Sequence, residues 1–229
     1  MAMSEAFPML RKCDVLILAG GQGTRIQHLL PVGYPKCMAD VNGTPFVDIL
    51  IEKLISAGFD RIVFLAAHNG RSLEDYLQWK YRALENHRLE VVMQYEQLGT
   101  GGAVLDAEIA VESDPFFVAN GDTWTDFDLA SMAECHVQTN GLATVAVDGN
   151  MRNCGVFVFS KRIFEIMREM DRPFSTEDLF TELGRRHETV NFYYVEKPEF
   201  HDIGTPEGLT EFREFWSGRI TGAASSKGA

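Results

Sequence analysis

The sequence predicts an α/β protein in which a mostly parallel β-sheet lies between two layers of helices. Short runs of β-branched and aromatic residues alternate with amphipathic stretches along most of the chain. Several of these runs are apolar at nearly every position, as strands of a sheet covered on both faces are. The chain has 229 residues, of which 45% are hydrophobic, and can bury such a sheet. We therefore expect a three-layer α/β/α fold built on a Rossmann-like sheet.

Seven segments are expected to form the strands. Each has six or seven residues and is rich in valine, leucine, isoleucine or phenylalanine. Most are followed by glycine or polar residues that favour a turn. In chain order they are "CDVLILA" (13–19), "RIVFLAA" (61–67), "LEVVMQY" (89–95), "PFFVAN" (115–120), "LATVAV" (142–147), "GVFVFS" (155–160) and "TVNFYYV" (189–195).

The clearest helix signal is "TPFVDILIEKLISAG", which lies between the first two expected strands. Its apolar residues recur at helical spacing, Thr44 suits the N-cap and Pro45 suits the first helical position. Gly58 suits the C-terminal end of this helix. Two further helices are expected to begin at capping boxes in acidic form, at Ser72–Asp75 and Ser175–Asp178.

Composition limits the organisation and the partners. Residues 1–216 are expected to form one domain, because no linker or repeat divides them, and residues 217–229 to form a disordered tail. A net charge of -12 argues against nucleic acid and anionic membranes as partners, since both require a basic face. The four cysteines lack disulfide or metal spacing, which indicates reduced thiols. The apolar run at 15–19 is too short for a signal segment or a membrane span, so we expect a cytoplasmic protein.

The stretch "LILAGGQGTRI" (16–26) places a glycine-rich turn at the end of the first expected strand. Ligands of open parallel sheets bind beyond the carboxyl ends of the strands, so Gly20, Gly21 and Gly23 lie where a phosphate would. The dinucleotide fingerprint would need a glycine in place of Ile26, and a P-loop would need Gly-Lys followed by Ser or Thr. Both standard phosphate loops are therefore excluded. A glycine turn that only packs strand against helix remains open at this point.

The motifs that follow the glycine turn indicate which kind of site it belongs to. The run L-A-G-G-x-G-T-R, followed by P-K-x-M and V-N-G-x-P-F, resembles the signature of sugar-1-phosphate nucleotidyltransferases. Four later segments are similar to the same family in the same order: "EQLGTGGAV" (96–104), "VANGDTW" (118–124), "NCGVFVFS" (153–160) and "FHDIGTPEGL" (200–209). The resemblance implies the nucleotide-diphospho-sugar transferase fold. The sequence looks most like D-glycero-α-D-manno-heptose 1-phosphate guanylyltransferases, followed by mannose-1-phosphate guanylyltransferases and N-acetylmuramate-1-phosphate uridylyltransferases.

The resemblance also implies a reaction. A sugar 1-phosphate attacks the α-phosphorus of a nucleoside triphosphate, with GTP favoured over UTP, and gives a nucleotide sugar for surface polysaccharides together with pyrophosphate. Arg25 and Lys36 are then expected to hold the phosphates. Asp122 is expected to be catalytic and to hold one Mg²⁺ with Asp202, although each aspartate read alone could instead end a turn or cap a helix. The implied nucleotide-binding residues are Leu18, Ala19, Gly20, Gly21, Gly23, Thr24, Glu96, Gly99 and Thr100, and the implied sugar-binding residues are Asn120, Asn153 and Gly155.

Such a reaction needs no general base, and the sequence shows no Ser-His-Asp arrangement that would supply one. A phosphate monoester has a second pKa of about 6, so the attacking oxygen is largely ionised at neutral pH. The barrier comes from bringing two polyanions together and from charge that develops on the leaving pyrophosphate. Positioning and cations lower such a barrier.

The sequence departs from the family in one segment. Most members carry an insertion ending in Glu-Lys-Pro before the N-x-G strand, and its lysine helps to bind the sugar phosphate. Here "TVAVDGNMRNCGVFVF" leads directly from one strand to the next. The same letters recur later, but they follow the sugar strand, so that role is not assigned to Lys197. A shortened sugar lid and a lid missing from this sequence both stay open.

Two other classes of function stay open as well. A non-catalytic sensor of nucleotide sugars would keep the base-binding motif and lose turnover. A nicotinamide oxidoreductase is disfavoured by the missing third glycine and by the lack of an acidic residue at the end of "RIVFLAAHNG". Many relatives self-associate, so a homo-oligomer also stays open as an expectation for this chain.

Overall fold

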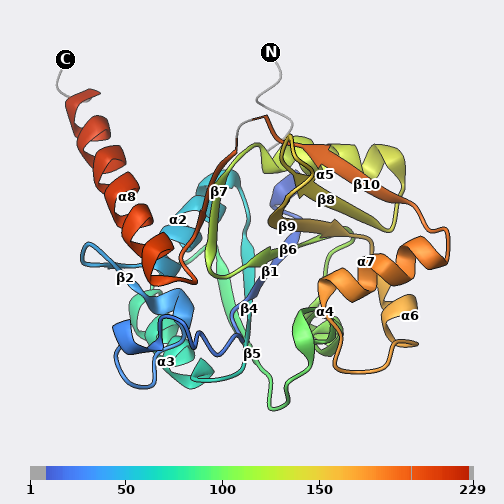
Figure 1. The fold of residues 1–229 in the computed structure, drawn as a ribbon, viewed down its shortest axis with the longest axis horizontal. Coiled ribbons are helices and arrows are strands. Elements are labelled where there is room, and N and C mark those ends of the chain that lie inside the picture. The colour runs from blue at the N-terminus through green and yellow to red at the C-terminus, as the bar shows by residue number, and fades with distance from the viewer. Residues whose placement is uncertain (1–8, 197, 227–229) are drawn as a thin grey trace.

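The fold is organised around a seven-stranded sheet, as a computed structural model of residues 9–196 and 198–226 shows, with side chains described to Arg219 (Figure 1). The strand order is β10-β8-β9-β6-β1-β4-β5. Only β9 runs antiparallel to its neighbours β6 and β8, and the other pairs are parallel. All seven expected strands are therefore present. Their bounds are β1 (Asp14–Leu18), β4 (Arg61–Ala66), β5 (Arg88–Met93), β6 (Phe116–Asn120), β8 (Ala143–Val147), β9 (Asn153–Phe159) and β10 (Val190–Tyr194).

Helices cover both faces of this sheet, which confirms the three-layer prediction. In β1, Val15 and Ile17 pack into one apolar cluster and Leu16 into another, because successive side chains of a strand point to opposite faces. The first cluster includes residues of α2 (Phe46–Ala57), α3 (Gly70–Lys80) and α5 (Leu129–Thr139). The second includes residues of α4 (Gly99–Asp106), α6 (Ile163–Met167) and α7 (Thr176–Arg185), which lie together on the right in Figure 1.

Two of the expected helix signals are confirmed. Gly58 directly follows α2 and has a φ of 112°, a left-handed conformation that glycine adopts without strain. Ser175 begins α7 with a complete capping box. Its hydroxyl accepts a hydrogen bond from the Asp178 N–H, and the Asp178 carboxylate accepts one from the Ser175 N–H.

Two others are wrong. Thr44 does not cap α2, because Thr44–Pro45 is strand β3 of a short hairpin with β2 (Asp40–Val41), and Pro45 lies one residue before the helix. Ser72 lies inside α3, and its hydroxyl donates to the carbonyl of Gly33 at 2.6 Å. A short hairpin thus takes up Thr44, and a contact with a distant segment takes up Ser72, where local spacing assigns a cap.

A second, two-stranded sheet was not expected from the sequence. It pairs β7 (Thr123–Asp126) antiparallel with β11 (Glu199–Asp202), so that Asp202 lies opposite Thr123. Trp124 packs beneath this ribbon in a third cluster with Phe212 of α8 (Pro206–Ser226), and it is only 3% exposed. Trp124 is therefore a packing residue. It does not line the cavity described below.

The chain after Trp216 differs from the expected tail. Helix α8 continues to Ser226, and residues 227–229 lie outside the described part. Arg219 holds the first part of this segment against the protein, since its guanidinium pairs with Asp126 at 2.7 Å and with Glu199 at 3.0 Å. These contacts with the β7–β11 ribbon cannot be anticipated from a count of apolar residues.

Two further expectations concern cysteines and membranes. All four cysteines are free, and three of them are buried. Among the described residues no helix combines the length and apolar character needed to cross a bilayer.

His136 links α5 to the sheet and gives stability a pH dependence. Its ring nitrogens bond the hydroxyls of Thr144 at 2.9 Å and Ser160 at 3.0 Å, and burial lowers its pKa from 6.5 to about 4. The neutral ring therefore stabilises the fold fully above pH 6.5, and up to about 3 kcal/mol is lost as the pH falls from 6.5 towards 4. We expect the variant His136→Gln to show a flatter dependence of unfolding free energy on pH in this window, measured by urea denaturation. An unchanged slope would contradict this assignment.

Candidate active site

A cavity of about 540 Å³ opens at the carboxyl edge of the central sheet. It lies between the glycine-rich loop after β1 and the first turn of α4. Its volume is typical of a small-molecule site. Nine of the site residues expected from the sequence line it: Leu18, Gly20, Gly21, Lys36, Glu96, Gly99, Thr100, Asn120 and Asp122.

The parallel strands bring these residues together. Strand β1 lies between β4 and β6, and the chain leaving it stays bonded to β4, since the Ala19 N–H donates to the Leu65 carbonyl at 2.9 Å. After β6, the Gly121 N–H donates to the Leu18 carbonyl at 3.0 Å. A Cβ on Gly121 would lie 2.7 Å from that carbonyl oxygen, so only glycine lets the two backbones approach this closely. The approach carries Asp122 to the mouth of the cavity.

The glycine loop folds around Lys36. Gly23 has a φ of 61°, and a Cβ there would lie 3.1 Å from the Cβ of Lys36. The Lys36 ammonium lies beside Gly21 and forms an ion pair with the carboxylate of Asp122. Ala19, Gly23 and Thr24 belong to the loop without lining the cavity. The loop thus presents its backbone and one cation to the opening.

Lys36 is held by a buried turn. The 3-10 turn η2 (Lys36–Met38) places Cys37 and Met38 in the core, which leaves the lysine side chain to extend outward. Burial raises the pKa of the Cys37 thiol to about 12, so this cysteine is no thiolate nucleophile.

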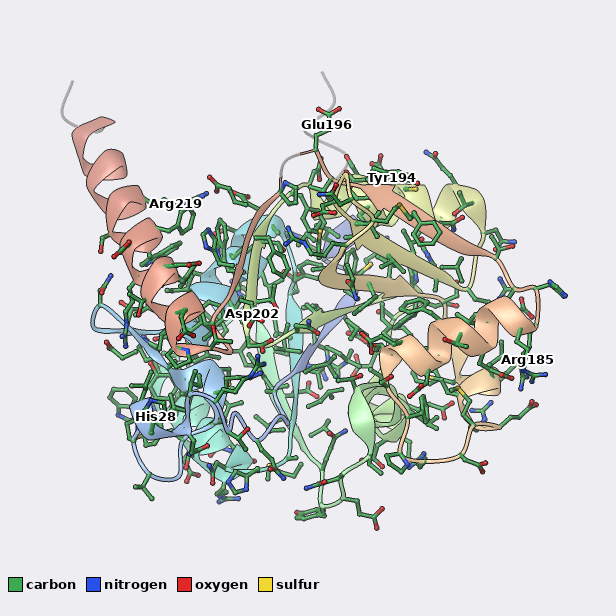
Figure 2. The ribbon with its side chains drawn as sticks, viewed as in Figure 1. His28, Arg185, Tyr194, Glu196, Asp202 and Arg219 are labelled. Atoms are coloured by element: carbon green, nitrogen blue, oxygen red, sulfur yellow. The ribbon has the colours of Figure 1, made fainter. Side chains whose placement is uncertain are left out.

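Asp122, Asp202 and Arg25 converge on one point beside the cavity. A Cβ placed on Gly204 would lie 2.8 Å from Asp202 Oδ1, 3.1 Å from Asp122 Oδ2 and 3.5 Å from Arg25 Nη2. The two carboxylate oxygens are therefore within about 6 Å of each other. Figure 2 shows Asp202 near the centre of the molecule, at the foot of α8. Residues that are far apart in the sequence thus share one crevice.

Asp202 does not cap α8. Its carboxylate accepts a hydrogen bond from the Gly204 N–H at 2.7 Å, whereas the hydroxyl of Thr205 accepts from the Gly208 N–H at 3.0 Å. Thr205 is thus the residue that caps the helix. The Asp202 carboxylate stays free to face Asp122.

The two carboxylates suit a hard divalent cation. Within the described residues no group of three or more His, Cys, Asp and Glu side chains could hold a metal ion. Mg²⁺ binds in such sites through one or two carboxylates, completed by substrate phosphates and water. The pair Asp122 and Asp202 fits this pattern, with Arg25 and Lys36 adjacent to it.

The expected sugar residues lie close to one another, but only Asn120 lines the cavity, and Asn153 and Gly155 do not. Asn120 ends β6, opposite Gly155 of β9, and a Cβ on Gly155 would lie 2.9 Å from its amide nitrogen. The Gly155 N–H donates to the Asn153 side chain at 2.8 Å. Asp148 closes the short turn between β8 and β9, because its carboxylate accepts hydrogen bonds from the backbone N–H groups of Asn150 and Arg152. Lys197 lies outside the described residues.

Three glutamines of the cavity were missed by the sequence analysis. Gln94 is 6% exposed, and its side-chain N–H donates to the carbonyl of Ala103 at 2.7 Å, which fixes the amide at the cavity wall. Gln22 and Gln97 also line the cavity. Gln94 falls inside an expected strand, so nothing in the local pattern distinguishes it from a packing residue.

Comparisons with known proteins identify the family of the chain. A nucleotidyl transferase family model matches residues 14–152. The D-glycero-alpha-D-manno-heptose 1-phosphate guanylyltransferase of Aneurinibacillus thermoaerophilus is 26% identical over 85% of this chain and 94% of its own. The crystal structure of HddC from Yersinia pseudotuberculosis complexed with GMP-PN superposes with a TM-score of 0.74 at 26% identity, covering 89% of this chain and 99% of that one. A mannose-1-phosphate guanylyltransferase subunit from Xenopus tropicalis is 30% identical over 69% of this chain and 44% of its own length.

The close approach at Gly121 generates a prediction. Gly121→Ala should lower the free energy of unfolding by about 1–3 kcal/mol, because the new methyl group forces β6 away from β1. The matched control is Gly149→Ala, where a Cβ would meet no atom within 4 Å, and its effect should stay below about 1 kcal/mol. Equal effects in urea denaturation would contradict the steric argument.

Proposed function

The chain belongs to the nucleotidyl transferase family, and we propose that it transfers GMP from GTP to a sugar 1-phosphate of the heptose or mannose type, releasing pyrophosphate. The observation that carries this proposal is the convergence of Asp122, Asp202, Arg25 and Lys36 at the mouth of a nucleotide-sized cavity. Two carboxylates and two cations in one crevice suit a reaction between two phosphate-bearing substrates. A reaction that consumes GTP also fits the cytoplasm, where nucleoside triphosphates are supplied.

The phosphate-binding roles follow from the type of each cation. Arg25 lies at the tip of the glycine loop, and its planar fork suits the paired oxygens of the β- and γ-phosphates. Lys36 is a compact charge on the cavity wall, suited to the α-phosphate as the attacking phosphate approaches it. Since the nucleophile is already ionised, these residues need only orient it in line with the leaving group.

Asp122 and Asp202 would hold the Mg²⁺ that the donor set fits. When bound, this ion would neutralise charge on the triphosphate and on the departing pyrophosphate. The protein contributes two rigid carboxylates, since Asp122 follows the constrained Gly121 and Asp202 is bonded to the Gly204 N–H.

The preference for GTP rests on the base side of the cavity and on the relatives named guanylyltransferases. Glu96 lines the cavity and makes no ion pair with any described residue, so its carboxylate is available as a hydrogen-bond acceptor. Guanine presents N–H donors at both N1 and N2, whereas uracil presents a single N–H donor. A carboxylate in the pocket for the nucleobase therefore favours guanine over uracil.

An assay of the purified chain tests the proposal. With Mg²⁺ present, pyrophosphate release should be fastest with GTP combined with a heptose or mannose 1-phosphate. Faster release with UTP would indicate a uridylyltransferase. Tight GTP binding without pyrophosphate release from any member of a sugar 1-phosphate panel would indicate a nucleotide sensor.

The role of Asp122 makes a sharper prediction. Asp122→Ala should lower kcat by about a hundredfold or more, because it removes a metal-binding carboxylate placed for the transition state. The melting temperature should change little, because the side chain fills no core volume. The control Asp75→Ala removes an exposed carboxylate that pairs with Arg71 on α3, and it should retain most activity. Normal turnover by Asp122→Ala would place the reaction elsewhere.

A further inference from the structure

The loop expected to hold the nucleobase, residues 96–102, is fastened to the start of α7, and we call it the base loop. The Phe174 N–H donates to the Leu98 carbonyl at 3.0 Å. The Phe174 carbonyl in turn accepts from the N–H groups of Gly101 at 3.0 Å and Gly102 at 3.1 Å. The side chain of Thr100 adds a further contact, because its hydroxyl accepts a hydrogen bond from the Thr176 N–H at 2.9 Å. These residues come from segments more than 70 positions apart in the sequence.

This contact determines which backbone donors remain for a ligand. The first N–H groups of a helix have no partner within the helix. In α4, the protein itself uses those of Gly101 and Gly102 through the Phe174 carbonyl. The N–H groups of Gly99 and Thr100 make no hydrogen bond to any residue in the described part of the chain, and both residues line the cavity. Two of the N–H groups at the start of α4 are thus bonded within the protein, and the other two remain available to a nucleotide.

The glycines of the base loop are explained by the same contact. A Cβ on Gly101 would lie 2.6 Å from the Phe174 ring and 2.8 Å from the Ser175 carbonyl. Gly99 has a φ of 73° and lies against the backbone of Phe174. The glycine-rich sequence here therefore accommodates a neighbouring segment of the protein, in addition to any ligand.

The hydroxyl of Thr100 is engaged by the protein as well. It accepts from the Thr176 N–H and lies 3.3 Å from the hydroxyl of Thr176, which is only 4% exposed. Its side chain thus has a partner before any nucleotide arrives. The sequence expectation that Thr100 contacts the nucleotide is better assigned to its backbone N–H.

We propose that Thr176 is a positioning residue for the nucleotide, acting through Thr100 to hold the base loop with its free N–H groups directed into the cavity. The proposal rests on the assigned nucleotide site and adds the start of α7 to its support. Nucleotide affinity then depends on a hydroxyl pair in which the Thr176 side chain never touches the ligand.

A double-mutant cycle tests the pair. The variants are Thr100→Val, Thr176→Val and the double variant, and the readout is the equilibrium Kd for GTP with Mg²⁺ in the absence of sugar phosphate. Each single change should weaken GTP binding by about three- to tenfold, the value of one lost hydrogen bond. Thr176→Val removes only the hydroxyl–hydroxyl contact, whereas Thr100→Val also removes the bond from the Thr176 N–H, so the double variant should bind GTP no more weakly than Thr100→Val alone. Thr176→Ser should restore most of the affinity, since it keeps the hydroxyl.

A matched control comes from the same helix. The hydroxyl of Thr181 donates to the Glu177 carbonyl within α7 at 2.9 Å, so Thr181→Val removes one hydroxyl without touching the base loop. Its Kd for GTP should equal that of the wild type. In steady-state assays, Thr176→Val should raise the KM for GTP and leave the KM for the sugar phosphate unchanged.

Three outcomes would overturn the proposal. Additive losses would show that the two threonines act independently. An unchanged Kd in Thr176→Val, even with a lower melting temperature, would leave the pair a purely structural role. An equal loss in Thr181→Val would assign the effect to α7 as a whole. Failure of the proposed function would look different, since the wild type would then release no pyrophosphate while the cycle could still be measured by GTP binding.

Discussion

The antiparallel pairing of β7 with β11 is the constraint on which the candidate site depends. It places Asp202 opposite Thr123 and so brings its carboxylate beside Asp122, eighty positions earlier in the chain. The ribbon is held from below by Trp124, which packs against His201 and Phe212. The aromatic residues that pack the ribbon against α8 thus support the strands that carry the two acids, although Trp124 does not line the cavity. If the ribbon shifted by one residue, the side chain of Asp202 would point to the opposite face.

Much of the fold could be predicted because burial leaves a strong local pattern. Several of the central strands are apolar on both faces, and that pattern depends little on what lies around them. Strands β7 and β11 could not be predicted in the same way, because "TWTD" and "EFHD" are short and mix polar with aromatic residues. These two segments pair only because they contact each other and α8 in the folded chain. The two serine boxes make the same point, since Ser175 starts a helix and Ser72, with the same spacing to aspartate, is taken by Gly33.

The candidate site shows a similar division. The motifs locate the glycine loop, Lys36 and both aspartates, because the sequence resemblance marks each of them. The motifs do not separate a ligand contact from a contact within the protein. Thr100 belongs to a nucleotide motif, yet its hydroxyl is bonded to Thr176, and Gln94 belongs to an expected strand, yet it follows β5 and lines the cavity. Such roles arise from segments that meet only in the folded chain, so single-sequence reasoning has no signal for them.

The far end of α8 adds a consequence for thermal behaviour. Arg219, labelled on this helix in Figure 2, joins both strands of the ribbon from outside through Asp126 and Glu199. Exposed ion pairs of this kind are weak, and helix ends open at a lower free energy than the core of a domain. Fraying that reaches Arg219 would loosen the strand bearing Asp202 while the central sheet stays folded. Warming would then lower the activity through local unfolding of α8 and the ribbon, at temperatures below the melting temperature of the whole domain.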